Sequence, residues 1–179
     1  MSYSKSEIPS SARTAITRHS PSALARFVGE QLLPLDMVFD WGCGKGFDIV
    51  HYLKNADMVC GWDPHFNPAP HPNTLKSVFN IVTCSCVLNV LQKQERETCL
   101  HDISDFLPCG GKAYFSVRTK HDIDSNKKPS WKQENDGWIT SIGTFQHGFR
   151  TDELKKLISQ YFKTVNVMKR TPLIIEALK

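Results

Sequence analysis

The sequence predicts an α/β fold, a three-layer sandwich built around a mostly parallel sheet. Short apolar segments rich in β-branched residues alternate with amphipathic helical segments, and this alternation is typical of βαβ units. The last two strand-like segments, 164–168 and 173–178, are close enough to pair as a hairpin. We therefore expect one antiparallel strand at the end of an otherwise parallel sheet. Ligands of such sheets bind beyond the carboxyl ends of the strands.

The first half of the chain supplies two strand–helix units. Ser20 and Pro21 suit a helix start, as N-cap and first helical residue, and Pro34 ends that helix. Beyond it we expect a strand over 37–39, a helix over 47–55 and a strand over 58–62.

The second half continues the pattern. The segment 64–73 contains four prolines and is expected to be an irregular loop. The apolar run 78–88 begins as a central strand. Thr151 suits an N-cap. The remaining expected elements are a helix over 92–106, a strand over 112–117 and a helix over 151–161.

The 179 residues fit one domain spanning 1–179, with a Ser-rich N-terminal arm over 1–19 and a loop or lid insertion over 119–143. No apolar run approaches the length of a membrane span, and the first residues lack the apolar core of a signal peptide. We therefore expect a cytoplasmic protein without a membrane partner. The six cysteines include no C-x₂₋₄-C pair, so we predict no metal site.

A net charge of +4 permits an anionic partner but does not require one. The densest cationic stretch, 118–132, is either a backbone clamp for a nucleic acid or a solvated loop.

The strongest functional signal is the segment Asp-Trp-Gly-Cys-Gly-Lys-Gly over 40–46, between a strand and a helix. Its alternate glycines let the backbone turn sharply and approach a ligand closely. Asp63 ends the next strand, where an acid can accept the hydroxyl hydrogens of a ribose. Together they indicate a nucleoside cofactor. A nicotinamide dinucleotide is the first alternative, although its fingerprint is G-x-G-x-x-G.

With Pro-Cys-Gly-Gly over 108–111 before a strand, these motifs resemble the class I S-adenosylmethionine-dependent methyltransferases, in the same order along the chain. The resemblance implies a Rossmann-like methyltransferase sandwich with S-adenosylmethionine as cofactor. It places Asp63 on the ribose, with Trp62 either stacking on the cofactor or buried against the sheet. The residues that it places at the methionine side are Asp40, Gly42, Gly44 and Gly46, and Cys43 of the same loop is a further candidate for binding the cofactor.

A narrower resemblance links the chain to methyltransferase-like proteins associated with bacterial DNA phosphorothioation. It is carried by Arg-Thr-Ala-Ile-Thr-Arg over 13–18, Gly-Trp-Asp-Pro-His over 61–65, Val-Leu-Asn-Val over 87–90 and Gly-Thr-Phe-Gln over 143–146. Members of that family are longer, so this chain corresponds to their methyltransferase-like core.

Methyl transfer from a sulfonium needs an in-line approach and exclusion of water more than it needs a base. Asn89 is a candidate for orienting the acceptor, or it caps a helix. His65 either covers the cofactor or caps the loop, and His147 either closes over the site or lies on a surface loop. Arg13 and Arg18 either contact an anionic substrate or form a solvated arm.

The leading hypothesis is a methyltransferase acting on a small molecule or a locally read nucleotide. The first alternative is a non-catalytic domain that binds S-adenosylmethionine or a partner within a DNA-modification system. The second is a nucleic-acid methyltransferase. Neither the oligomeric state nor the methyl acceptor follows from the sequence.

Overall fold

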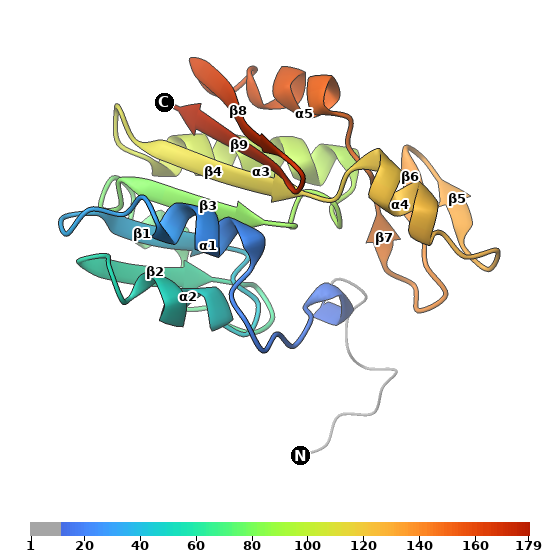
Figure 1. Ribbon diagram of the computed structural model, residues 1–179, viewed down its shortest axis with the longest axis horizontal. Coiled ribbons are helices and arrows are strands. Elements are labelled where there is room, and N and C mark those ends of the chain that lie inside the picture. Colours follow the sequence, from blue (N-terminus) through green and yellow to red (C-terminus); the bar gives the residue numbers. More distant parts are fainter. Residues whose placement is uncertain (1–11) are drawn as a thin grey trace.

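A computed structural model describes residues 12–179 (Figure 1). A six-stranded sheet runs in the order β2-β1-β3-β4-β9-β8. Strands β1 to β4 are parallel neighbours, whereas β9 is antiparallel to both β4 and β8. The strands are β1 (Met37–Trp41), β2 (Met58–Trp62), β3 (Ile81–Ser85), β4 (Lys112–Val117), β8 (Thr164–Arg170) and β9 (Leu173–Leu178). The predicted fold class is confirmed, including the antiparallel strand from the C-terminal hairpin.

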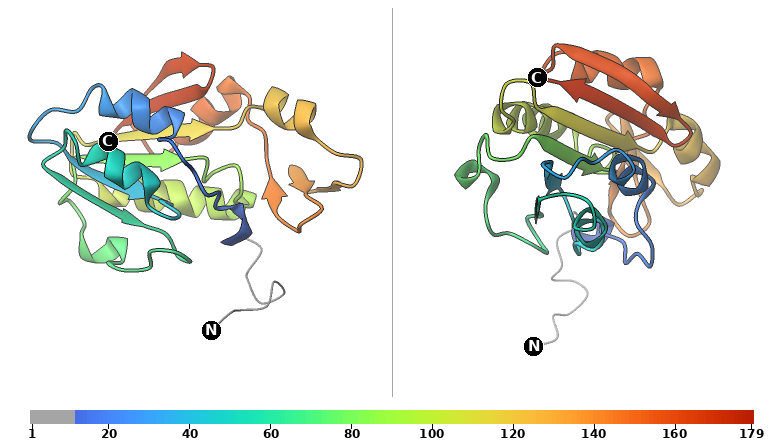
Figure 2. Two further views of the ribbon diagram at one scale, coloured as in Figure 1. Left: turned by 60° about the horizontal axis from the view of Figure 1, so that its bottom comes forward. Right: turned by 60° about the vertical axis from the view of Figure 1, so that its left-hand side comes forward.

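Helices cover both faces of the sheet, so the body has three layers (Figures 1 and 2). Successive strand residues point to opposite faces. Phe39 and Val82 therefore join the apolar cluster of α3 and α5, whereas Val38 and Ile81 join that of α1 and α2. The helices are α1 (Ala23–Gly29), α2 (Phe47–Tyr52), α3 (Lys93–Phe106) and α5 (Thr151–Ile158).

Two helices begin at a different residue from the one predicted. Ser22, not Ser20, is the N-cap of α1, because its hydroxyl accepts a bond from the N–H of Ala25 at 2.9 Å. Arg150 precedes α5, and Thr151 is its first helical residue. In α5 the Glu153 carboxylate reaches back to the Arg150 N–H, so an acid in the first turn, rather than a threonine, satisfies the free donor.

The segment between β2 and β3 contains one short 3₁₀ helix, η2 (Pro72–Thr74), and no strand, as its prolines predict. Strand β2 therefore forms one edge of the sheet.

The segment after β4 is more ordered than its polar composition predicts. It forms α4 (Lys120–Asn126), β5 (Lys132–Glu134) and β6 (Gly137–Ile139), and β6 pairs with β7 (Phe145–Gln146) in a second, three-stranded sheet. A capping box closes the start of α4. Gly137 permits the pairing, since a Cβ there would lie 2.4 Å from the Phe145 Cζ atom. This small sheet lies beyond the carboxyl end of β4 (Figure 1, right).

Within residues 12–179, no helix combines the length and the apolar character needed to span a membrane.

Candidate functional site

A cleft of about 740 Å³ opens at the carboxyl ends of the parallel strands. Its volume falls within the roughly 300–1,000 Å³ typical of small-molecule sites. The walls come from the segment 14–18, the glycine loop, the segments 62–65 and 85–91, and the first turns of α3. Arg118 after β4 and Gln146 of β7 complete the wall. The cleft therefore lies where open α/β sheets bind ligands.

The glycine loop is shaped by two close approaches. The N–H groups of Gly42 and Cys43 both donate to the Trp62 carbonyl, at 2.8 and 3.1 Å, which ties the loop to the end of β2. Gly42 has a φ of +72°, and a Cβ there would lie 2.3 Å from Val87. Gly44, with a φ of +54°, faces more open space, since a Cβ would meet only Ala15, at 3.6 Å. A side chain at Gly44 would therefore enter the cleft.

Asp63 connects the end of β2 to the glycine loop. Its Oδ2 atom accepts a bond from the Gly44 N–H at 3.1 Å. Its Oδ1 atom accepts from the N–H groups of His65 and Phe66, at 2.9 and 3.1 Å. A carboxylate has about four acceptor positions, so one position on Oδ2 stays available to a ligand in the cleft.

Asp40 is a buried acid at the floor of the cleft. The Thr83 hydroxyl donates to its Oδ1 atom at 2.9 Å. Burial, reinforced by the nearby Asp48 carboxylate, raises the pKa of Asp40 from 3.8 to about 7. A positive charge bound nearby would favour its ionised form.

Of the three remaining residues assigned to the cofactor, Cys43 and Trp62 line the cleft, whereas Gly46 lies outside the lining and is the left-handed N-cap of α2, with a φ of +76°. Burial raises the pKa of the Cys43 thiol to about 12, so it stays protonated at neutral pH. Trp62 packs edge-on against Trp41, with ring centroids 5.7 Å apart, and against His71 on its other side. Trp62 therefore both packs against the core and faces the cleft.

The segment before α1 crosses the mouth of the cleft. Residues 14–18 line it, and the Lys45 ammonium donates to the Thr17 hydroxyl at 2.6 Å. Arg13 lies outside the lining and donates to the Ile142 carbonyl in the β6–β7 turn at 3.0 Å. The remainder of the predicted arm, residues 1–11, lies outside the described residues. Arg18 itself is half-buried and faces the cleft.

Asn89 is completely buried and its side-chain amide joins three segments. Its Nδ2 group donates to the main-chain oxygens of Arg118 and His147, at 2.9 and 2.6 Å. Its Oδ1 atom accepts from the Arg118 N–H at 2.7 Å. The amide thus fixes the chain after β4 and after β7 to the end of β3.

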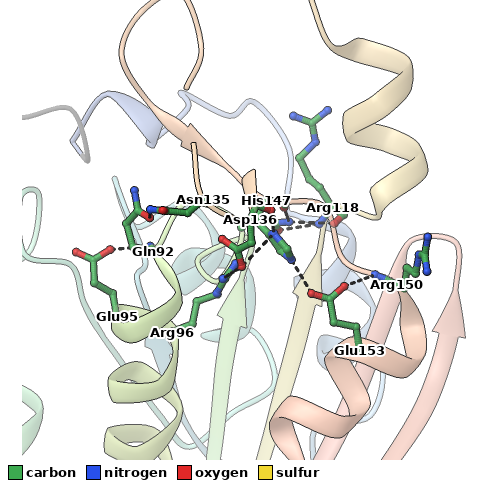
Figure 3. Close-up of polar contacts among 10 residues, drawn as sticks. Gln92, Glu95, Arg96, Arg118, Asn135, Asp136, His147, Arg150 and Glu153 are labelled. Carbon is green, nitrogen blue, oxygen red and sulfur yellow. Dashed lines mark hydrogen bonds and ion pairs between the residues drawn. The ribbon is translucent and has the colours of Figure 1, made fainter. Parts of the chain in front are cut away.

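His147 lies behind the cleft, in a polar network that joins the small sheet to α3 and α5 (Figure 3). Its Nδ1 atom faces the Asp136 carbonyl at 2.6 Å, and its Nε2 atom faces the Glu153 carboxylate at 2.8 Å. The buried Arg96 guanidinium forms an ion pair with the Asp136 carboxylate. Both ring nitrogens of His147 are thereby engaged. His65, by contrast, is exposed and lines the cleft beside Asp63.

Arg96 and Asp136 carry no individual signal in the sequence. Arg118, Gln146, Arg96 and Asp136 are brought together by pairing between segments that are distant in the chain. Arg118 follows a predicted strand and begins the cationic stretch, and Gln146 ends the Gly-Thr-Phe-Gln segment, but neither signal predicts a place in the cleft wall.

The cationic stretch after β4 is partly neutralised within the chain. The Lys120 ammonium pairs with Asp124 at 2.6 Å, and the Lys127 ammonium lies 3.9 Å from the centroid of the Trp138 ring. In the part of the chain that the structure describes, no group of three or more His, Cys, Asp or Glu side chains is arranged to hold a metal ion.

No protein-family model matches the chain, and no curated protein sequence matches it. Solved structures do share its fold. The chain is similar to the 1,6-didemethyltoxoflavin-N1-methyltransferase of Burkholderia thailandensis, solved with S-adenosylhomocysteine, at 17% identity and a TM-score of 0.63, over 88% of this chain and 78% of that chain.

Two further similar structures are methyltransferases of sugars. One is CalS10 of Micromonospora echinaspora, an amino pentose methyltransferase, at 14% identity and a TM-score of 0.60, over 86% of this chain and 89% of that chain. The other is the sugar N-methyltransferase KedS8 of a Streptoalloteichus species, at 11% identity and a TM-score of 0.63, over 87% of this chain and 85% of that chain. At these identities the likeness establishes the fold, which is the Rossmann-like fold of S-adenosylmethionine-dependent methyltransferases.

Proposed function

We propose that this protein is an S-adenosylmethionine-dependent methyltransferase that acts on a small molecule. The observation that carries the proposal is the cleft at the carboxyl ends of β1 to β4, bounded by a glycine loop and by Asp63. The solved methyltransferases named above support it, because they share the fold and one of them was solved with the demethylated cofactor.

The residues of the cleft suit this cofactor chemically. Asp63 has an acceptor position left for a ribose hydroxyl, and Gly44 leaves room for the cofactor to approach the backbone. Asp40 supplies a carboxylate for the positively charged end, and Trp62 and Val87 supply apolar surface. When bound, the cofactor supplies an electrophilic methyl group. The protein's part is to orient the acceptor and exclude water.

We infer different roles for the three catalytic candidates. Asn89 and His147 act as positioning residues, because their polar atoms are bonded within the fold. Asn89 fixes Arg118, and the main-chain bond from the His147 N–H to the Asn89 carbonyl helps to place Gln146 at the cleft wall. His65 is the candidate that can contact a ligand directly, since its side chain is exposed at the cleft.

A small-molecule acceptor fits the charge distribution better than a nucleic acid does. Lys120 and Lys127, in the stretch predicted as a backbone clamp, are engaged by Asp124 and Trp138. The link to DNA phosphorothioation rests on sequence motifs, and the comparisons add nothing to it.

Titration calorimetry with S-adenosylmethionine and S-adenosylhomocysteine tests the proposal, followed by transfer of a labelled methyl group into a fractionated metabolite extract. We expect micromolar cofactor binding and label in a small-molecule fraction. Cofactor binding without labelling of any fraction would favour the non-catalytic alternative. Labelling of nucleic acid, with an affinity of the protein for that nucleic acid that falls steeply as salt rises, would favour a nucleic-acid methyltransferase. Failure of a folded, ligand-free protein to bind either cofactor would refute the proposal.

A further inference from the structure

Two half-buried arginines line the cleft. Arg18 lies in the segment that crosses the mouth, and Arg118 follows β4. Within residues 12–179, neither guanidinium forms a hydrogen bond or an ion pair with another side chain or with the main chain. Figure 3 shows the Arg118 guanidinium pointing away from the network of His147 and Glu153.

Both cations act on the same part of the cleft. Burial raises the pKa of the Cys86 thiol at the end of β3, and the charges of Arg18 and Arg118 both oppose that rise. Cys86 also lines the cleft, and its N–H donates to the Ser116 carbonyl at 2.9 Å, near the end of β4. The positive charge is therefore concentrated near the ends of β3 and β4.

Among residues 12–179 no acid of the cleft forms an ion pair with either arginine, although the charge of Arg18 acts on Asp40 and opposes the burial that raises the pKa of Asp40. Asp63 accepts three main-chain N–H groups, Glu95 accepts the Gln92 N–H, and Asp48 accepts the Ser22 N–H. Asp122, whose pKa Arg118 helps to lower, uses its carboxylate mainly to cap α4. Guanidinium groups are suited to carboxylate and phosphate groups, which they bind bidentately.

We propose that the methyl acceptor is an anionic small molecule whose carboxylate or phosphate group is bound by Arg118 together with Arg18. This inference rests on the proposed function. Because neither guanidinium has a hydrogen-bonded partner within residues 12–179, both can donate to an acid group of the acceptor. Because the Asn89 amide bonds both the N–H and the carbonyl of Arg118, Arg118 is presented on a rigid segment. Arg118 is therefore the residue that would select the acceptor.

The test is a two-dimensional NMR titration of the ¹⁵N-labelled chain saturated with S-adenosylhomocysteine. Inorganic phosphate is added in one series and acetate in the other, and the arginine Nε–H resonances are followed. We expect saturable shifts, and the probe that binds more tightly identifies the acceptor's anionic group. Arg118→Gln should weaken binding by at least about tenfold, as expected for the loss of a charge-assisted contact. S-adenosylhomocysteine affinity should stay within about twofold.

Arg170→Gln is the matched control, because it removes the same charge from an exposed position in β8. Equal shifts in Arg118→Gln and in the wild type would mean an adventitious ion only and would overturn the inference. Anion binding that disappears once S-adenosylhomocysteine is bound would also overturn it, since the arginines would then serve the cofactor. An oligonucleotide that binds the saturated chain far more tightly than phosphate would assign the arginines to a nucleic acid instead.

The inference and the proposed function can fail separately. If S-adenosylhomocysteine causes no shifts, the proposed function fails. Phosphate and acetate titrations of the chain alone then still decide whether Arg118 forms an anion site.

Discussion

Asp63→Ala is the most informative single change, because the Asp63 carboxylate both anchors the glycine loop and faces the cleft. Its Oδ1 and Oδ2 atoms accept three main-chain N–H groups, and one acceptor position is left for the ribose. The bonds to His65 and Phe66 lie at the surface, where water can replace the carboxylate. We therefore expect a loss of about 1–2 kcal/mol in the free energy of unfolding.

The loss of cofactor affinity should be larger than this loss of stability. A charge-assisted hydrogen bond to the ribose contributes about 1.5–3 kcal/mol, so the Kd for S-adenosylhomocysteine should rise about ten- to a hundredfold. Titration calorimetry measures the Kd, and urea unfolding measures the stability. Asp57→Ala, at an exposed acid without a side-chain bond among the described residues, is the control. A Kd within twofold of the wild-type value in a folded Asp63→Ala protein would refute our assignment.

Three further changes test other parts of the site. Asp40→Asn should gain stability over the wild type as pH rises from about 4 to about 7, because the wild-type carboxyl stays protonated in the folded state but loses its proton in the unfolded state. The pKa values of 3.8 (unfolded) and about 7 (folded) correspond to a gain on the order of 4 kcal/mol in the free energy of unfolding. Urea unfolding of both proteins at the two pH values measures it. The same variant should bind the sulfonium cofactor, but not its neutral product, less tightly than the wild type at pH 8. Gly44→Val should abolish cofactor binding. The control is Gly110→Val, at a position with a similar positive φ and open space around it, which should lower only the free energy of unfolding, by the backbone strain of about 1–2 kcal/mol. Equal cofactor binding by the two variants would mean that the glycine loop is only a turn. Asn89→Ala should cost about 2–4 kcal/mol and speed hydrogen exchange in β6 and β7, and an unchanged unfolding midpoint would contradict its positioning role.

The parallel sheet could be predicted because each of its strands carries a local signal. The segments 58–62 and 112–117 form strands with the predicted bounds, since they are apolar and end at turn residues. The strands of the small sheet carry no such local signal in the sequence. Strands β5 and β6 are short and mostly polar, and they depend on Gly137 packing closely against Phe145. The helix boundaries were displaced by one or two residues where another side chain supplied the cap.

The residues of the cleft likewise fall into a group that the sequence predicts and a group that it does not. A backbone that must turn sharply or approach a ligand requires glycine, and an acid after a strand of a parallel sheet has a known position, so the loop and Asp63 can be recognised along the chain. Arg118 is defined instead by its place at the cleft wall, where its guanidinium forms no hydrogen bond within residues 12–179, and Asn89 by bonds to residues 29 and 58 positions away. The sequence pattern thus points to the half of the cleft that suits the cofactor, which is built from consecutive residues. The half that we assign to the acceptor is assembled from β3, β4 and β7 and depends on one buried amide. A change of acceptor between related proteins would then require changes in these dispersed segments while the glycine loop stays the same.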